Sequence, residues 1–250
     1  MRTLFSILYG LLAYLACMAT LLYFIGFSGN LLVPRSVDVG ASAGLFEALG
    51  TDALLLLLFG VQHSVMARRG FKRWWTQVVP AAVERSTFVV ASCVALALLF
   101  RFWVPIGTPV VWRVAHEGAA ALLWGLFALG WLVALVSTFL LDHFALFGLR
   151  QVFAAGARGA APPDVFRTPL FYRYVRHPLY LGFLLGLWAV PVMTFGHLLF
   201  ALGLSAYILV GIAFEECDLL LRFGERYRAY RRQVGMLVPR IAARADRAGR

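Results

Sequence analysis

Long apolar runs are the feature of this sequence that most constrains its fold. A helix needs roughly 20 predominantly apolar residues to cross the hydrocarbon core of a bilayer. Hydrophobic residues make up 62% of the chain and the mean hydropathy is +0.80, values that ordinary soluble domains do not reach. Runs of sufficient or nearly sufficient length lie near residues 4–27, 44–66, 87–104, 118–141, 178–194 and 197–220. The sequence predicts an all-α integral membrane protein with five to six transmembrane helices, in one domain over residues 1–240.

The fifth run is the weakest of these predicted crossings. It is short, contains Pro191, and joins the sixth run through Thr194 and Gly196. Two geometries stay open: a full crossing, or a re-entrant helix that dips into the bilayer and turns back. In both, residues 178–220 form a C-terminal helical hairpin. Arginines alternate with Phe223, Tyr227 and Tyr230 after it, which predicts that the sixth helix continues as an amphipathic cytoplasmic extension.

Basic residues are distributed unevenly between the two ends of the predicted helices. The net charge is +11, and of the 23 basic residues only Arg35, Arg101 and Arg113 fall on one side. By the positive-inside rule the crowded side is cytoplasmic, which places both termini in the cytoplasm. The loops are too short to form a basic nucleic-acid-binding module, so the charge is expected to face anionic lipid. We expect residues 241–250 to be a disordered basic tail, and the centre of the loop 150–176 to be flexible.

Polar residues gather at the cytoplasmic helix ends, where charged groups are costly and mark functional sites. On the outer side, polar residues are expected to be isolated at the interface, and they include Asn30, Asp38, Glu47, His116, Glu117 and His197. The cytoplasmic set comprises Gln62, His63, Glu84, Arg85, Asp142, His143, Arg176, His177, Glu215, Glu216 and Asp218. We therefore expect the site in the cytoplasmic leaflet.

Several of these residues also have a purely structural interpretation. Glu215 and Asp218 share a helix face with Arg222 and would form a surface network, which leaves Glu216 as the inward-facing acid. Pro178 after His177 is a favourable helix start, and Gly182 with Gly186 forms a GxxxG pair suited to close helix packing. The histidines lack the spacing of a metal site, and the three cysteines lack that of a disulfide framework.

The C-terminal third contains a distinctive set of motifs: Arg176-His177-Pro178-Leu179-Tyr180-Leu181-Gly182, Glu215-Glu216, Phe223-Gly224, Tyr227, Tyr230 and Val238-Pro239. This pattern resembles the isoprenylcysteine carboxyl methyltransferase superfamily. Further segments lie upstream: Gly26-Phe27-Ser28-Gly29-Asn30, Gln62-His63-Ser64-Val65-Met66-Ala67-Arg68, Glu84-Arg85-Ser86-Thr87, Ser137-Thr138-Phe139, Asp142-His143-Phe144 and Phe147-Gly148-Leu149-Arg150-Gln151. With them the resemblance narrows to the bacterial methanethiol S-methyltransferases and covers nearly the whole chain.

The resemblance implies transfer of a methyl group from S-adenosylmethionine to methanethiol, giving dimethyl sulfide, in the bacterial inner (cytoplasmic) membrane. It implies a small volatile thiol as substrate, contact with membrane lipid, and neither nucleic acid nor an obligate protein partner. The residues that it implies for the cofactor are Arg176, His177, Pro178, Tyr180, Leu181, Glu215, Glu216, Tyr227 and Tyr230. No metal is expected.

Methyl transfer to sulfur requires a thiolate, whereas a small alkyl thiol is mostly protonated near neutrality. The site therefore needs a base or a cation that stabilises the thiolate. His143 is the first candidate for the base and His63 the second, with Arg150 or Arg85 as the cation. Asp142 is expected to cap a helix or pair with an arginine, because adjacent helical residues point in different directions.

Three other functions stay open. A different methyl acceptor, such as a prenylcysteine carboxylate, would use a similar C-terminal region. A membrane reductase that uses NADPH is more distant and rests on a shared hairpin pattern. A transporter or accessory subunit would need polar residues through the midplane, where this chain has almost only Leu, Ala, Val and Phe.

Overall fold

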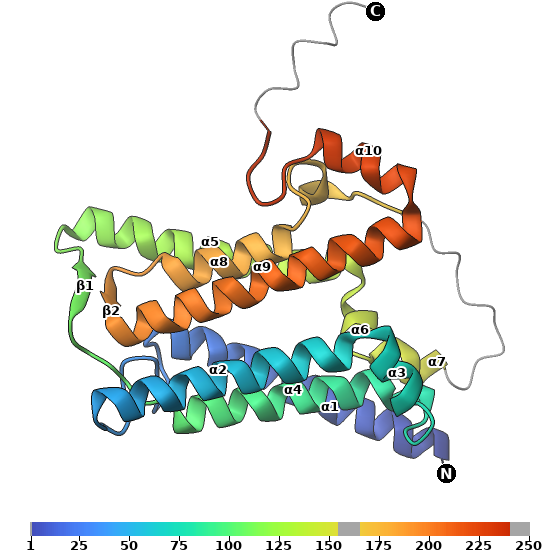
Figure 1. The fold of residues 1–250 in the computed structure, drawn as a ribbon, viewed down its shortest axis with the longest axis horizontal. Coiled ribbons are helices and arrows are strands. Elements are labelled where there is room, and N and C mark those ends of the chain that lie inside the picture. Colours follow the sequence, from blue (N-terminus) through green and yellow to red (C-terminus); the bar gives the residue numbers. More distant parts are fainter. Residues whose placement is uncertain (1, 155–165, 241–250) are drawn as a thin grey trace, which may run out of the picture.

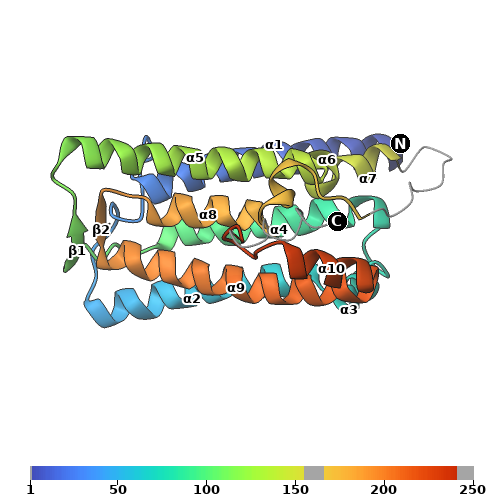
Figure 2. The ribbon, with the colours of Figure 1, turned by 90° about the horizontal axis from the view of Figure 1, so that it is seen from above.

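The long helices of the protein are arranged in two layers (Figures 1 and 2). The computed structural model describes residues 2–154 and 166–240. In one layer α4 packs between α1 and α2, and in the other α8 packs between α5 and α9. The six helices are α1 (Arg2–Gly29), α2 (Leu45–Ala67), α4 (Ala81–Phe102), α5 (Glu117–Leu141), α8 (Pro178–Trp188) and α9 (Phe195–Phe223).

Short elements lie at both ends of the bundle (Figure 1). The end at which α2, α5 and α9 finish is called the basic end. It carries α3 (Arg69–Trp75), α6 (His143–Leu146), α7 (Leu149–Ala154), η1 (Leu170–Arg173) and α10 (Glu225–Gln233). The opposite end, called the strand end, carries β1 (Val110–Arg113) and β2 (Val192–Thr194). The predicted flexible loop centre and the predicted tail 241–250 lie outside the described residues.

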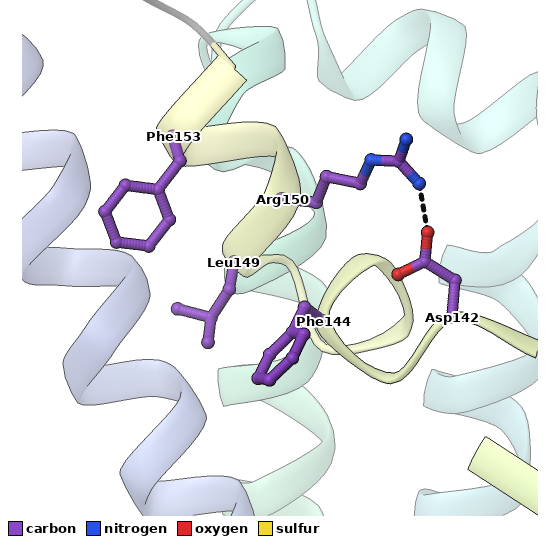
Figure 3. Close-up of a pocket in the computed structure, with 5 residues that line it drawn as sticks. All are labelled: Asp142, Phe144, Leu149, Arg150 and Phe153. Carbon is purple, nitrogen blue, oxygen red and sulfur yellow. Dashed lines mark hydrogen bonds and ion pairs between the residues drawn. The ribbon is translucent and has the colours of Figure 1, made fainter. Parts of the chain in front are cut away.

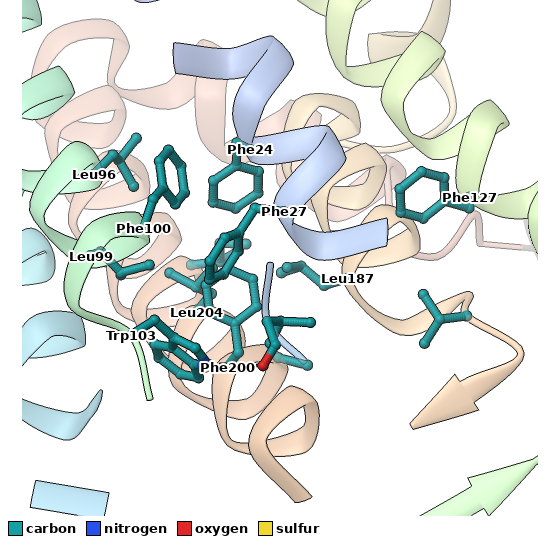
Figure 4. Packing of buried hydrophobic residues seen from close by; sticks show 14 of the residues in the cluster. Phe24, Phe27, Leu96, Leu99, Phe100, Trp103, Phe127, Leu187, Phe200 and Leu204 are labelled. Atoms are coloured by element: carbon teal, nitrogen blue, oxygen red, sulfur yellow. Dashed lines mark hydrogen bonds between the residues drawn. The ribbon is translucent and has the colours of Figure 1, made fainter. Parts of the chain in front are cut away.

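Within the described residues, five helices are long and apolar enough to cross a membrane: α1, α2, α4, α5 and α9. Their bounds follow the predicted runs closely, although α4 begins earlier than residue 87. The predicted fold class, an all-α integral membrane protein, is confirmed. Between the two layers, Phe27 of α1 and Trp103 pack on Phe200 of α9, with ring centroids 5.5 Å and 5.3 Å apart (Figure 4).

The prediction that the fifth run is helical up to residue 194 was wrong. Helix α8 ends at Trp188, and the chain continues extended into β2, which pairs antiparallel with β1. Pro191 explains the end, because its ring would clash with the carbonyl of Leu187 and it has no N–H to donate. The segment still runs from the basic end to the strand end (Figure 1), as a short helix followed by extended backbone.

Irregular backbone within a membrane protein must find hydrogen-bond partners inside the protein. The Leu187 carbonyl accepts from His197 Nε2 at 3.1 Å, and the Val190 carbonyl accepts from Trp112 Nε1 at 3.0 Å. The Pro191 carbonyl accepts from the Val114 N–H at 2.9 Å. These bonds replace the helical ones that α8 loses, so the extended half of the segment is stable at this depth.

Close contact between α5 and α8 depends on glycine. A Cβ atom at Gly182 would lie 2.5 Å from the carbonyl oxygen of Gly130, and one at Gly186 would lie 2.7 Å from the Trp131 ring. Both distances are too short for a side chain, so the α8 backbone lies directly against the Gly130 backbone and the Trp131 ring. The predicted packing role of Gly182 and Gly186 is confirmed.

Candidate functional site

A buried ion cluster joins α8, α9 and α10 at the basic end. Glu216 Oε1 lies 2.7 Å from Arg176 Nε and 3.1 Å from His177 Nε2, and Glu216 Oε2 lies 3.3 Å from Arg231 Nε. Both carboxylate oxygens of Glu216 are therefore held by protein groups. As predicted, Glu216 is the inward-facing acid, with 8% of its surface exposed.

The same cluster fixes the segment that follows α10. The backbone N–H groups of Arg176 and His177 donate to the carbonyls of Gly235 and Met236, at 2.8 Å and 3.1 Å. The Arg176 guanidinium also donates to the Val234 carbonyl at 2.6 Å. Residues 234–236, called the C-terminal strap, thus lie against the start of α8.

The strap reaches this position because α9 and α10 are separate helices. Gly224 ends α9 with a φ of +53°, in the left-handed region that favours glycine. The chain turns there, and α10 lies over the end of α9 (Figure 1). The prediction that α9 continues directly into an amphipathic extension was wrong in this respect, although α10 exists and alternates arginine with tyrosine.

Glu215 has surroundings unlike those of Glu216. Its side chain is 43% exposed, and its Oε2 lies 3.8 Å from His177 Nδ1. The Tyr180 hydroxyl donates a hydrogen bond to it, and Tyr172 and Tyr207 are electrostatic neighbours of Tyr180. A carboxylate surrounded by tyrosines therefore stays open to a ligand.

His63 on α2 lies beside one of these tyrosines, Tyr207. Its ring is 6.0 Å from the Tyr207 ring and 4.7 Å from the Phe88 ring. The Ser92 hydroxyl donates to the Phe88 carbonyl, so it must accept from His63 Nδ1, which is 3.1 Å away. The lone pair of His63 is then on Nε2, which has no hydrogen-bond partner within residues 2–154 and 166–240.

Arg85 also contacts the Phe88 ring. Its guanidinium carbon is 4.8 Å from that ring centroid, and its Nε donates to the Leu146 carbonyl at 2.7 Å. Arg85 lies close enough to His63 for its positive charge to interact with the His63 ring. The structure therefore places the predicted base His63 and the predicted cation Arg85 together.

His143 occupies a different environment. The Thr138 hydroxyl donates to the Leu135 carbonyl and so accepts from His143 Nδ1 at 2.8 Å. His143 Nε2 then accepts from the Tyr14 hydroxyl at 3.0 Å. The ring stacks on Phe139 with the centroids 4.1 Å apart, and burial lowers the pKa of His143. Unlike His63, it has both ring nitrogens bonded within the protein.

Asp142 and Arg150 form an ion pair beside His143 (Figure 3). Asp142 also accepts from the Ala145 N–H at 3.1 Å, so it both caps α6 and pairs with an arginine, as predicted. The pair borders a pocket of about 490 Å³ whose other walls are Phe144, Leu149 and Phe153. Elements α6 and α7 pack on α1, α4 and α5.

Tyr227 and Tyr230 of α10 hold the segment that precedes α8. Both rings contact Phe166, at centroid distances of 5.9 Å and 5.3 Å, and the Tyr230 hydroxyl donates to the Tyr172 carbonyl at 2.5 Å. Burial raises the pKa of Tyr230 to about 12. The Tyr227 hydroxyl is buried and has no partner among the described residues. Pro178 and Leu181 lie in the first turn of α8, where the Leu181 N–H donates to the His177 carbonyl at 3.0 Å.

Sequence reasoning missed two residues at this end and misjudged the other end. Tyr207 belongs to no motif, and Arg68, although it ends the segment 62–68, was given no role. Arg68 lies 3.9 Å from Asp218 and is an electrostatic neighbour of Tyr207, so it links α2 to α9. At the strand end, the expectation of isolated polar residues was wrong, because Asn30 donates to Asp38 at 2.7 Å and Thr194 donates to the same aspartate.

Comparison with known proteins identifies the family. Methanethiol S-methyltransferase 2 of Bradyrhizobium diazoefficiens is 54% identical over 238 residues, which cover 95% of this chain and 91% of that protein. The methanethiol S-methyltransferase of Pseudomonas deceptionensis is 53% identical over 237 residues, 94% and 90% of the two chains. That of Mycobacterium tuberculosis is 49% identical over 240 residues, 96% and 98% of the two chains.

The chain belongs to the methanethiol S-methyltransferase family. No family model matches it, and no solved structure matches it. Membership makes the protein a membrane methyltransferase, which disfavours the reductase and transporter alternatives. In this member of the methanethiol S-methyltransferase family, the described residues contain no group of three or more His, Cys, Asp or Glu side chains placed to hold a metal ion.

Proposed function

We propose that the protein transfers a methyl group from S-adenosylmethionine to methanethiol, forming dimethyl sulfide and S-adenosylhomocysteine at the cytoplasmic leaflet. The observation that carries the proposal is the polar group shared by α2, α8 and α9, in which Glu215 and Tyr180 lie at one side and His63 at the other. The relatives' names supply the acceptor, and the residues supply a means of binding a cation and of activating a thiol.

The residues fit the proposed cofactor. S-Adenosylmethionine supplies an electrophilic methyl group on a positively charged sulfur, together with hydroxyl groups and an aromatic base. Glu215, partly exposed and held by Tyr180, offers a carboxylate that accepts hydroxyl hydrogen bonds and attracts positive charge. Tyr172, Tyr180 and Tyr207 offer aromatic faces, which bind both flat rings and cations.

Glu216, Arg176 and Arg231 have a different part, because their charged groups bond to one another. They hold α10 and the C-terminal strap against α8, and so fix the wall that Tyr180 and Glu215 belong to. In this proposal His177 links the two glutamates: its Nε2 bonds to Glu216 and its Nδ1 faces Glu215. Arg176, Glu216, Tyr227 and Tyr230 are then positioning residues.

His63 is proposed as the base that removes the thiol proton. Its Nε2 lone pair is free of described partners, whereas both nitrogens of His143 are bonded within the protein. Arg85, which contacts the same Phe88 ring as His63, is the proposed cation that stabilises the thiolate. The apolar walls around His63 exclude water, which strengthens that interaction. Arg150 is neutralised by Asp142 and is the weaker choice.

The orientation in the membrane follows from charge. Most arginines lie at the basic end, which by the positive-inside rule faces the cytoplasm of the bacterial inner membrane. The proposed site then receives soluble cofactor from the cytoplasm and volatile thiol from the bilayer. Lipid headgroups would surround the basic end.

The test is headspace gas chromatography of the purified full-length protein given methanethiol with and without S-adenosylmethionine. We expect dimethyl sulfide only when the cofactor is present. Cofactor binding without dimethyl sulfide would contradict the proposed acceptor and favour another, such as a prenylcysteine carboxylate. Cofactor-independent product would contradict the proposed donor.

A further inference from the structure

Two buried cysteines face each other across α1 and α4. Cys17 and Cys93 are each 9% exposed and lie in one apolar cluster, with Met18, Met66 and Phe147 packed around it. The two thiols are neighbours within this cluster and interact with each other. No other pair of described cysteines is adjacent, since the third, Cys217, is exposed on α9.

A pocket of about 320 Å³ lies between the same two helices, about one helical turn from the cysteines toward the strand end. Thr20 and Ala97 line it, and Thr20 is also a neighbour of Cys93. The remaining lining residues are Ala19, Tyr23, Phe100 and Arg101. Both helices are long and apolar enough to cross a membrane, so we expect ligands to reach this pocket from the bilayer.

We propose that Cys17 and Cys93 form a dithiol site for small dialkyl disulfides dissolved in the membrane. Two adjacent thiols react with disulfides by exchange and also bind soft metal ions. The approach through lipid and a largely apolar pocket favours the neutral disulfide over a charged ion. Dimethyl disulfide is the ligand that we name, and this choice rests on the proposed function because it is the oxidised dimer of methanethiol.

The exchange balances without another reactant. The sulfur of Cys93 attacks one sulfur of dimethyl disulfide, the S–S bond breaks, and the first methanethiolate leaves with the Cys93 proton. The sulfur of Cys17 then attacks Cys93 in the mixed disulfide and expels the second methanethiolate, which takes the Cys17 proton. The two cysteines are oxidised to one disulfide, and dimethyl disulfide is reduced to two methanethiol molecules. The second step is intramolecular, which favours completion.

The experiment uses the reduced full-length protein in lipid nanodiscs, with dimethyl disulfide and without S-adenosylmethionine. Methanethiol is measured in the headspace, and disulfides are mapped by peptide mass spectrometry. We expect two methanethiol molecules per protein and a Cys17–Cys93 cross-link. Cys17→Ala should release one and stop at a mixed disulfide on Cys93. Cys217→Ala is the matched control and should retain the cross-link.

Modification confined to Cys217, or no cross-link in the wild-type protein, would overturn the proposal. The wild-type mapping decides this even if a cysteine variant fails to fold. Because no methyl donor is present, failure of methyl transfer does not affect the result: a cross-linked protein that makes no dimethyl sulfide would contradict only the proposed function. A cross-link with dimethyl disulfide but not with a bulky dialkyl disulfide would support the pocket as its route.

Discussion

At the scale of single residues, the adjacent acids Glu215 and Glu216 differ because a helix turns by about 100° per residue. Glu216 points between α8 and α10, where Arg176 and Arg231 compensate its charge. Glu215 points toward Tyr180 and stays partly exposed. One acid therefore supports the structure and the other is available to a ligand.

Glu216→Gln should destabilise the protein, and Glu215→Gln should weaken cofactor binding. Removing the Glu216 charge leaves two arginines of a buried cluster uncompensated, at a cost of roughly 3 kcal/mol. Glu215→Gln should leave the melting temperature unchanged and raise the Kd for S-adenosylmethionine about 10-fold or more. Thermal unfolding and calorimetric titration separate the two effects. Equal effects of the two variants in both measurements would contradict the division of roles.

His63→Ala should lower kcat about 100-fold or more at saturating thiol, as expected for loss of a general base. His143→Gln is the matched control, because the amide can retain bonds to Tyr14 and Thr138. It should keep most of the turnover. The measurement is the initial rate of dimethyl sulfide formation. If His143→Gln lost turnover and His63→Ala kept it, the base would be His143, the first sequence-based candidate.

His143 should make stability depend on pH. Burial lowers its pKa in the folded protein, while the unfolded chain has a value of about 6.5. Between these two values the unfolded state binds more protons, so stability falls as the pH drops below about 6.5 and the loss is complete below the folded value. His143→Gln should flatten the melting temperature over that range. Parallel pH curves for the two proteins would contradict this.

At the scale of elements, helix contacts decide where the site residues lie. Helix α8 is short, yet Gly182 and Gly130 let it lie directly against α5. That contact fixes the start of α8, which carries His177, Pro178 and Tyr180. The extended segment after Trp188 completes the span and pairs with β1.

Gly130→Ala should destabilise the protein more than Gly125→Ala, although both substitutions are on α5. A Cβ at Gly130 would lie 2.7 Å from the Gly182 carbonyl oxygen, whereas one at Gly125 has no neighbour within 4 Å. Gly125→Ala should be neutral or stabilising by about 0.5–1 kcal/mol, since alanine favours helix. Thermal unfolding of purified protein in detergent measures both. Equal melting temperatures would mean that α5 and α8 are not held by backbone contact.

At the scale of the whole molecule, the short helices and most of the basic residues lie at the same end of the bundle. The basic end carries α3, α6, α7 and α10, and the strand end carries Arg35, Arg101 and Arg113. In the proposed function, a site at the basic end receives soluble cofactor from the cytoplasm and thiol from the bilayer.

Arg228→Cys at the basic end and Glu117→Cys at the strand end should be labelled from opposite sides of the membrane. Both positions are exposed, and Cys217→Ala removes the exposed native thiol. An impermeant maleimide should modify Glu117→Cys in spheroplasts and Arg228→Cys only in inverted vesicles. The reverse pattern would contradict the cytoplasmic placement of the basic end.

Apolar run length and arginine placement by themselves determined the membrane class, the positions of the five long helices and the basic end, because these are one-dimensional properties of the chain. Local rules also held for Pro178 at a helix start, for Asp142 as a cap and for glycine packing. Short sequence motifs were sufficient to indicate the family.

Tertiary structure decided everything that depends on partners distant in sequence. Glu216 and Arg231, or His63 and Ser92, meet only when helices pack. That packing distinguishes the free lone pair of His63 from the two bonded nitrogens of His143, and it sends the chain after Trp188 into a strand. Whether a side chain has all its hydrogen bonds made depends on the residues that surround it in the fold. The type of a residue and its position in the sequence therefore do not tell whether it is free to react.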